Sequence, residues 1–238
     1  MPLRAILFDI DDTLVPTSEF ARRARANAVQ AMVDAGLGLP AEQVERELAE
    51  VIAEFSSNYD HHFDKLLQRL RPDSLDALNP ALIVAAGVAA YHDTKFRELA
   101  PFEDVIPLLE GLRSAGVRTG IITHGWTIKQ AEKLVRLGLV SLLDGDSIFI
   151  SDQIGISKPN PKLYRQVLAR LGLEPGEVMY VGDNLSHDIA PPNSLGMVTT
   201  WARRAARRRD VEGIAPDHVV DDFDELRSIL RSQYDLEV

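Results

Sequence analysis

Cysteine is absent from this chain of 238 residues. Its absence excludes disulfide bonds, thiolate nucleophiles, iron–sulfur clusters and thiolate zinc sites. The side chains left for chemistry carry carboxylate, imidazole, hydroxyl or amine groups. Hard cations with oxygen ligands therefore remain possible, whereas thiol chemistry does not.

Positive charge is scarce, because 26 lysines and arginines stand against 36 aspartates and glutamates, and the formal net charge is −10. A chain of this charge repels the phosphate backbone of nucleic acids and the surface of anionic membranes. We therefore expect neither nucleic-acid nor membrane partners. The sequence is compatible with a monomer or a homodimer.

Long apolar stretches are missing as well. The longest run, Ala81 to Tyr91, is far shorter than the roughly 18 residues that cross a bilayer, and it is typical of a buried helix. The apolar run before Asp9 has only four residues, too few for the core of a secretory signal. We expect a cytoplasmic location.

Short apolar runs that end abruptly in polar residues predict buried parallel strands. The predicted strands are Leu3 to Phe8, Val117 to Ile122, Ser147 to Ile150 and Val178 to Val181, with weaker ones at Met197 to Thr200 and His218 to Val220. Helical patterns separate most of them, at Val105 to Ala115, Thr127 to Leu137, Pro161 to Leu171 and Asp224 to Gln233. Strands alternating with helices predict an α/β fold with a doubly wound parallel sheet.

The first two predicted strands are too far apart for an ordinary strand-to-helix connection. The intervening residues show helical periodicity in four pieces, Ser18 to Ala35, Ala41 to Ser57, Asp60 to Leu70 and Pro80 to Arg97. We therefore predict a catalytic core of residues 1–15 and 98–238, with an all-helical domain of residues 16–97 inserted into it.

Polar residues follow the predicted strands at the edge where doubly wound sheets bind ligands. They are Asp9 and Asp11 after the first strand, Thr123 after the second, Lys158 in the loop after the third, and Gly182-Asp183 with Asp188 after the fourth. Each has an ordinary explanation alone, such as a helix cap or a turn. Their joint occurrence, in order and at successive strand ends, favours a single functional site.

The first pair of carboxylates suits phosphoryl transfer. Asp9 is placed to attack phosphorus and form an acyl phosphate, which divides one difficult displacement into two easier ones. Asp11, two residues along on the same side of an extended segment, is placed to give a proton to the leaving alkoxide and later to take one from water.

The remaining polar residues suit the charge of a phosphate group. A divalent cation with oxygen ligands would relieve the repulsion between phosphate and carboxylates, so Asp9, Asp183 and Asp188 imply Mg²⁺. Thr123 and Lys158 offer a hydroxyl and an ammonium for the equatorial phosphoryl oxygens.

These motifs resemble those of the haloacid dehalogenase superfamily, whose members carry four of them on a Rossmann-like core. The resemblance covers essentially the whole chain, because a helical cap inserted just after the first motif is one of the standard arrangements of the family. It implies the same residue roles, and it adds the backbone carbonyl of Asp11 as a metal ligand. His124 and Gly125, next to the Thr123 of the second motif, are further candidate phosphate- or substrate-binding residues.

Two positions depart from the family pattern. His124 stands where many relatives have asparagine, and it is as compatible with a substrate contact as with a solvent-facing loop. Pro191 and Pro192 follow Asp188 where relatives usually continue a helix of small residues, and we predict that the helix after the fourth motif begins later. An arginine cluster, Arg203 to Arg209, is either a solvated surface or a device that steers anionic substrates.

The main hypothesis is a Mg²⁺-dependent phosphomonoesterase acting on a small phosphorylated metabolite through an aspartyl-phosphate. A 2-haloacid dehalogenase or a phosphosugar mutase on the same fold remains open, as does a binding module without turnover. Asp11 and Gly182-Asp183 argue against the dehalogenase, since a halide leaving group needs neither acid nor metal.

Overall fold

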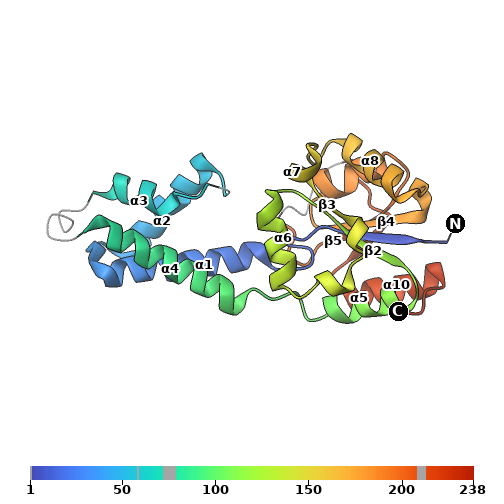
Figure 1. The fold of residues 1–238 in the computed structure, drawn as a ribbon, viewed down its shortest axis with the longest axis horizontal. Coiled ribbons are helices and arrows are strands. Elements are labelled where there is room, and N and C mark those ends of the chain that lie inside the picture. The colour runs from blue at the N-terminus through green and yellow to red at the C-terminus, as the bar shows by residue number, and fades with distance from the viewer. Residues whose placement is uncertain (1, 58, 72–78, 208–212) are drawn as a thin grey trace. The chain divides into compact units, whose positions relative to one another are not determined.

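The computed structural model describes residues 2–57, 59–71, 79–207 and 213–238 (Figure 1). The chain forms two compact units, Met1–Ser18 with Ala100–Val238, and Glu19–Leu99. The boundaries predicted at residues 16 and 97 fall close to these limits.

The first unit, here called the core unit, is built on a parallel sheet. Among the described residues the sheet has six strands in the order β3-β2-β1-β4-β5-β6. Its strands are β1 Ala5–Phe8, β2 Arg118–Thr123, β3 Ile148–Ile150, β4 Val178–Gly182, β5 Val198–Ala202 and β6 His218–Val220. Every pairing is parallel, so the predicted doubly wound α/β fold is confirmed, with strand limits within two residues of those predicted.

Helices cover both faces of this sheet. They are α5 Val105–Ser114, α6 Thr127–Arg136, α7 Ser151–Ile154, α8 Pro161–Leu171, α9 Ala190–Asn193 and α10 Phe223–Tyr234. Figure 1 shows α5 and α10 on one side and α8 on the other. The ends of α8 follow the sequence signals, because Asn160 accepts a hydrogen bond from the Lys162 backbone and Gly172 ends the helix in a left-handed conformation.

The central strand β1 is buried on both faces, which is why it is apolar without interruption. Ala5 and Leu7 pack with Leu163 of α8, whereas the Phe8 ring meets Phe223 of α10 edge to face, with centroids 6.1 Å apart. This burial, worth about 1.5–3 kcal/mol for each large apolar side chain, fixes the register of β1 between β2 and β4. The carboxyl ends of the three strands therefore lie side by side.

The second unit is helical. Its elements are α1 Thr17–Met32, which begins in the core unit, a π-helical turn Val33–Leu37, α2 Ala41–Phe55, α3 His62–Leu70 and α4 Pro80–Glu98. A small apolar core holds them together, made of Val29, Met32, Leu37, Val44, Leu48, Leu66, Leu67 and Ile83. Every member comes from this unit, which therefore has a core of its own.

The prediction that Ala81 to Tyr91 is helical is confirmed, but the prediction that this helix is buried is wrong. The segment is helical within α4, but Ile83 and Gly87 are its buried residues, and Leu82 is 68% exposed. Only one side of α4 packs, with Gly87 so close to Met32 that a Cβ atom would lie 2.8 Å from Met32 Cγ. Among the described residues, no helix combines the length and apolar character that membrane crossing requires.

The prolines after the fourth motif do not delay helical structure there as the sequence predicts. A π-helical turn, Leu185–Ile189, leads directly into α9, which contains both prolines. They occupy the first turn of α9. Proline is tolerated there because the first turn has backbone N–H groups without intrahelical partners.

Candidate active site

The loop after β1 begins at the sheet edge with Asp9, whose backbone N–H donates to Val181 O of β4 at 2.9 Å. The Asp9 side chain is buried. Asp12, further along the loop, has a positive φ of 59°, and its carboxylate accepts a hydrogen bond from Ser18 N at 2.7 Å. Asp12 therefore supports the start of α1, which separates its role from that of Asp9.

Lys158 joins two carboxylates that are far apart in the sequence. Its Nζ lies 2.7 Å from Asp9 Oδ1 and 2.7 Å from Asp188 Oδ1, and the side chain is only 3% exposed. Burial by itself would lower the pKa of Lys158, but Asp188 and Asp9 raise it well above its usual range. The ammonium is therefore a fixed positive charge between the ends of β1 and β4.

Three carboxylates form an acidic group here. One oxygen each of Asp9, Asp183 and Asp188 lies within 4.8 Å of the others. Burial raises the pKa of Asp9 to about 7, with Lys158 opposing and Asp188 adding to the shift. Burial, Asp188 and Asp9 raise the pKa of Asp183 to about 8.

The charge of this group is incompletely balanced. Among the described residues, none donates a hydrogen bond to the Asp183 carboxylate or forms an ion pair with it. Asp188, in contrast, accepts from Lys158 and from Asn184 N at 3.0 Å. Three close carboxylates that share one ammonium have the hard oxygen donors and the surplus negative charge that suit a divalent cation.

Gly182 makes room for this arrangement. A Cβ atom on Gly182 would lie 2.4 Å from Asp188 Cβ, a distance that no real side chain could adopt without moving the loop. Next to it, the backbone carbonyl of Asp183 accepts a hydrogen bond from Trp201 Nε1 at 2.8 Å. Gly182 thus leaves the space that the Asp188 side chain occupies, and the hydrogen bond from Trp201 holds the backbone of Asp183 in place.

Asp11 lies outside the group of three carboxylates and has its own partners. Its Oδ1 accepts from Lys133 Nζ at 2.5 Å and from Thr17 Oγ1 at 2.6 Å, and its Oδ2 from Gln130 Nε2 at 3.0 Å. Burial works to raise the pKa of Asp11, but Lys133 and these hydrogen bonds outweigh it, and the pKa is lowered.

The residues of the second motif lie at the end of β2. Thr123 is fully buried, and its Oγ1 lies 3.0 Å from Gln130 Nε2. His124 is exposed, with Nδ1 2.6 Å from Ser157 Oγ, and partial removal of its ring from water, helped by Lys158, lowers its pKa. Gly125 has a φ of 138°, which an L side chain rarely adopts.

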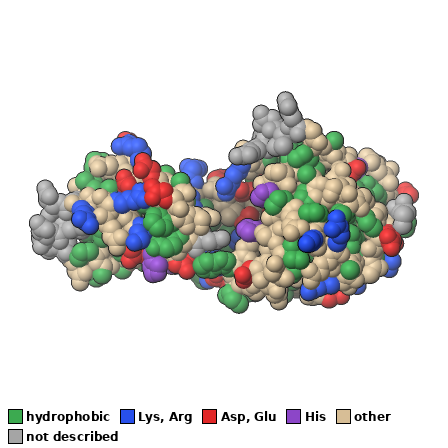
Figure 2. Space-filling model, turned by 90° about the horizontal axis from the view of Figure 1, so that it is seen from above, with side chains coloured by type: hydrophobic (Ala, Val, Ile, Leu, Met, Phe, Trp, Pro, Cys, Tyr) green, Lys and Arg blue, Asp and Glu red, His purple; other side chains and the backbone are tan. Residues whose placement is uncertain are grey.

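A cavity of about 460 Å³ opens over these strand ends. Of the predicted site residues, Asp9, Asp11, His124, Lys158, Asp183 and Asp188 line it, whereas Thr123 and Gly125 are not on its wall. In Figure 2, histidine and acidic side chains meet on one part of the surface of the core unit. The structure thus brings the candidates from all four motifs to one place.

The arginine cluster is divided by the structure. Arg203 pairs with Asp221 and Arg204 with Asp104, both through two hydrogen bonds. Arg207 reaches the cavity wall, where its Nε lies 2.7 Å from Ser18 Oγ and 3.3 Å from Asp12 Oδ2. Arg208 and Arg209 lie outside the described residues.

Two polar residues of the site were not among the predictions, Gln130 and Lys133. They lie three positions apart on α6, and this spacing places them on the same face of a helix. The sequence contained that signal, since they follow shortly after Thr123. Their contact with Asp11, more than a hundred residues earlier, depends on how α6 packs in the core unit.

Comparison with known proteins agrees with this geometry. The family model described as haloacid dehalogenase-like hydrolase matches residues 3–196. Glyceraldehyde 3-phosphate phosphatase of Methanopyrus kandleri is 46% identical over 231 residues, 96% of each chain, and that of Methanothermobacter thermautotrophicus is 39% identical over 96% of this chain and 100% of its own. A crystal structure of a HAD phosphatase from Thermococcus onnurineus is 29% identical with a TM-score of 0.65, over 96% of this chain and 98% of that one. The resemblance drawn from the four motifs is confirmed, and the chain belongs to the family of haloacid dehalogenase-like hydrolases.

Proposed function

We propose that this chain is a Mg²⁺-dependent phosphomonoester hydrolase and that its substrate is glyceraldehyde 3-phosphate or a similarly small phosphorylated aldehyde. The observation that carries the proposal is the buried Lys158 held by Asp9 and Asp188 beside Asp183, whose carboxylate has no partner among the described residues. This arrangement offers a nucleophile, a fixed cation and a place for a hard metal ion. The names of the relatives that match over nearly their whole length support the substrate.

The proposed reaction has two steps. Asp9 attacks phosphorus, an acyl phosphate forms, and the bond from phosphorus to the leaving oxygen breaks as Asp11 gives that oxygen a proton. Water then attacks the acyl phosphate, gives its proton to Asp11, and releases inorganic phosphate with restored Asp9. Lys158 and the Thr123 hydroxyl hold the equatorial oxygens throughout.

Asp9, Asp183 and Asp188 would hold the Mg²⁺ ion, together with the backbone carbonyl of Asp11 that the family resemblance implies. When bound, the ion supplies positive charge against the phosphate and the carboxylates. The fit of the site rests on the three carboxylate oxygens within 4.8 Å of one another. The helical unit is proposed as the cap that selects the substrate.

A substrate assay tests the proposal. With Mg²⁺, phosphate release from glyceraldehyde 3-phosphate should exceed that from dihydroxyacetone phosphate or an aryl phosphate by about tenfold or more in kcat/KM. Excess EDTA should stop the release in each case. Halide release from a 2-haloacid that persists in EDTA would instead identify a dehalogenase, and an isomerised sugar phosphate would identify a mutase. Absence of turnover on all of these substrates would contradict the proposal.

Lys133 supplies a second prediction, on pH dependence. In Lys133→Met, burial still raises the pKa of Asp11 but the ammonium that opposes it is gone, so the pKa rises. The basic limb of kcat/KM against pH, where Asp11 must keep the proton that it gives to the leaving oxygen, should therefore move to higher pH, and kcat should fall by about tenfold because Asp11 loses part of its orientation.

The matched control is Lys129→Met on the same helix, because the Lys129 ammonium lies over the Trp126 ring, 4.3 Å from its centroid, and not on Asp11. Its pH profile should equal that of the unmodified enzyme. A basic limb that stays in place in Lys133→Met would show that Lys133 does not govern the ionisation of Asp11.

A further inference from the structure

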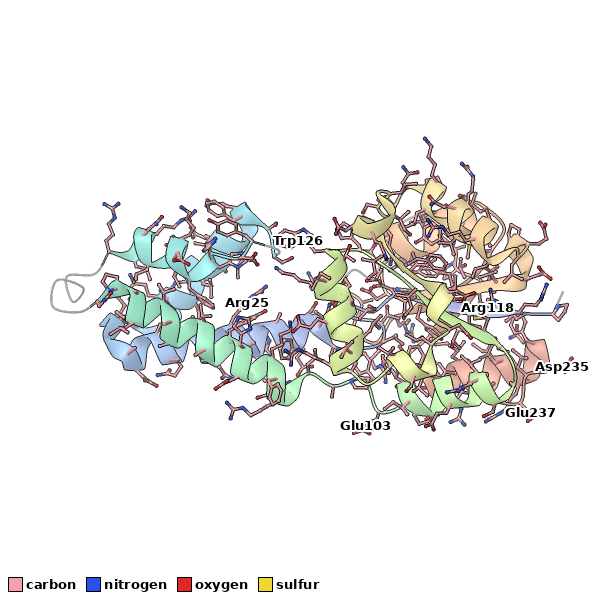
Figure 3. The ribbon with its side chains drawn as sticks, in the orientation of Figure 1. Arg25, Glu103, Arg118, Trp126, Asp235 and Glu237 are labelled. Atoms are coloured by element: carbon pink, nitrogen blue, oxygen red, sulfur yellow. The ribbon has the colours of Figure 1, made fainter. Side chains whose placement is uncertain are left out.

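Gln130 is a buried polar side chain that the proposed reaction does not use, and it is 4% exposed. Its amide nitrogen lies 3.0 Å from Thr123 Oγ1, 3.0 Å from Asp11 Oδ2 and 2.6 Å from His124 O. Gln130 follows Trp126, labelled in Figure 3, by one helical turn and donates its own backbone N–H to Trp126 O. One side chain of α6 thus contacts the loops after β1 and β2 together.

The chemistry of these partners fixes which end of the amide faces them. The His124 carbonyl can only accept a hydrogen bond, and it makes the shortest of the three contacts. The NH₂ end of Gln130 must therefore face the group, with its two hydrogens shared among three acceptors. Thr123 Oγ1 accordingly accepts from Gln130.

The direction of the Thr123 hydroxyl proton follows from this. An oxygen that accepts from Gln130 directs its own proton elsewhere, and among the described residues no acceptor receives that proton. It is left for a phosphoryl oxygen that comes within reach of the end of β2, next to His124 on the cavity wall. Without Gln130, the hydroxyl would be free to turn and donate to a neighbouring carboxylate instead.

The same amide also fixes the Asp11 carboxylate. Lys133 and Thr17 donate to Oδ1, and Gln130 donates to Oδ2, so both oxygens are held and the plane of the group is set. Gly125 makes space for this amide, because a Cβ atom at Gly125 would lie 3.1 Å from Gln130 Nε2. The loop of the second motif and the side chain of Gln130 are therefore fitted to each other.

We propose that Gln130 is a positioning residue that aligns the phosphate-binding hydroxyl of Thr123 and the proton-transferring carboxylate of Asp11 with each other. The proposal rests on the proposed phosphatase reaction for the roles of Thr123 and Asp11. Helix α6 then contributes to catalysis by positioning other side chains, without supplying a nucleophile or a metal ligand. No atom of Gln130 reacts, so its effect is transmitted through its two partners.

A double-mutant cycle between Gln130 and Thr123 tests this proposal. The variants are Gln130→Met, which keeps length and loses the donor, Thr123→Val, which keeps shape and loses the hydroxyl, and the pair. Calorimetry with inorganic phosphate and Mg²⁺ gives Kd, and steady-state kinetics give kcat and KM. Gln166→Met on α8, away from the cavity, is the matched control.

Gln130→Met should weaken phosphate binding by about tenfold, because a hydrogen bond to a charged group loses its direction. Its kcat should fall by about tenfold more than that of Thr123→Val, because Asp11 is affected as well. The double variant should bind phosphate no more weakly than Thr123→Val, since Gln130 acts on phosphate through that hydroxyl. The control should match the unmodified enzyme in all three constants.

Additive losses of phosphate affinity, or unchanged Kd and kcat in Gln130→Met, would overturn the proposal. If Gln130→Met lowers Tm by several degrees, Gln130→Asn is used in its place. Its side chain is shorter by one methylene, so the amide is drawn back from its partners, and the same changes in Kd and kcat are expected. Phosphate binding needs no turnover. An enzyme that binds phosphate but hydrolyses no phosphomonoester would overturn the proposed function, and the cycle on Kd would still decide the role of Gln130. Absence of phosphate binding would contradict both.

Discussion

Replacing Asp9 by asparagine is expected to reduce phosphate release by about 10⁴-fold or more, because an amide oxygen does not replace a carboxylate nucleophile. The same change should make the metal-free protein more stable above about pH 7. In that range Asp9 is ionised at the cost of its burial and of its repulsion with Asp188. Asparagine keeps the shape and can still accept the hydrogen bond from Lys158.

The opposite signs of the two effects make this experiment informative. Turnover is measured with the best substrate of the assay, the acyl phosphate is sought by mass spectrometry after acid quenching, and Tm is measured in EDTA at pH 8. Asp104→Asn is the control, because Asp104 pairs with Arg204 and does not line the cavity. It should lower stability and leave kcat unchanged. Residual turnover within tenfold of the unmodified enzyme would remove Asp9 from the role of nucleophile.

Removal of Mg²⁺ is expected to make the stability of the protein fall as pH rises from about 5 to about 8. The pKa of Asp9 is raised to about 7 and that of Asp183 to about 8, both above the ordinary value of 3.8. In this window the folded chain holds protons that the unfolded chain has lost, so the free energy of unfolding decreases with pH. Each such proton contributes a slope of about 1.4 kcal/mol per pH unit.

Bound Mg²⁺ should reverse this trend, because the ion replaces the protons and stabilises the ionised carboxylates. Unfolding in urea at pH 5 to 9, with EDTA or with excess MgCl₂, measures both effects. Asp183→Asn should remove about half of the metal-free slope and most of the response to Mg²⁺. Metal-free stability that increases between pH 5 and 8, or no response to Mg²⁺ at pH 8, would contradict the charge balance described for the site.

The strands, and the polar residues that follow them, could be predicted from the sequence for a physical reason. A parallel strand buried on both faces must be apolar throughout, so the point where Phe8 gives way to Asp9 is visible without a structure. Because parallel strands end at one edge, residues at successive strand ends predict one site. The fit of Gly182 against Asp188 could not be predicted, because it depends on the path of the loop between them.

The residues that the sequence did not reveal are those that act across helices. Gln130 and Lys133 have the pattern of any amphipathic helix, and only the packing of α6 brings them to Asp11. The burial of α4 was overestimated for a related reason. An apolar helix in a small unit can pack on one side only, and Leu82 then remains exposed despite its composition.

The position of β1 in the middle of the sheet has a consequence during protein synthesis. Ala5 pairs with Arg118 on one side and with Val178 on the other, so β1 leaves the ribosome long before either partner. At about 5–20 residues per second, this apolar strand waits roughly 5 to 25 s for β2 and longer for β4. The helical unit emerges during that interval and can form its own core first. During this interval the nascent chain therefore exposes an apolar strand whose backbone hydrogen bonds are not yet paired. Chaperone binding or aggregation can then compete with completion of the sheet.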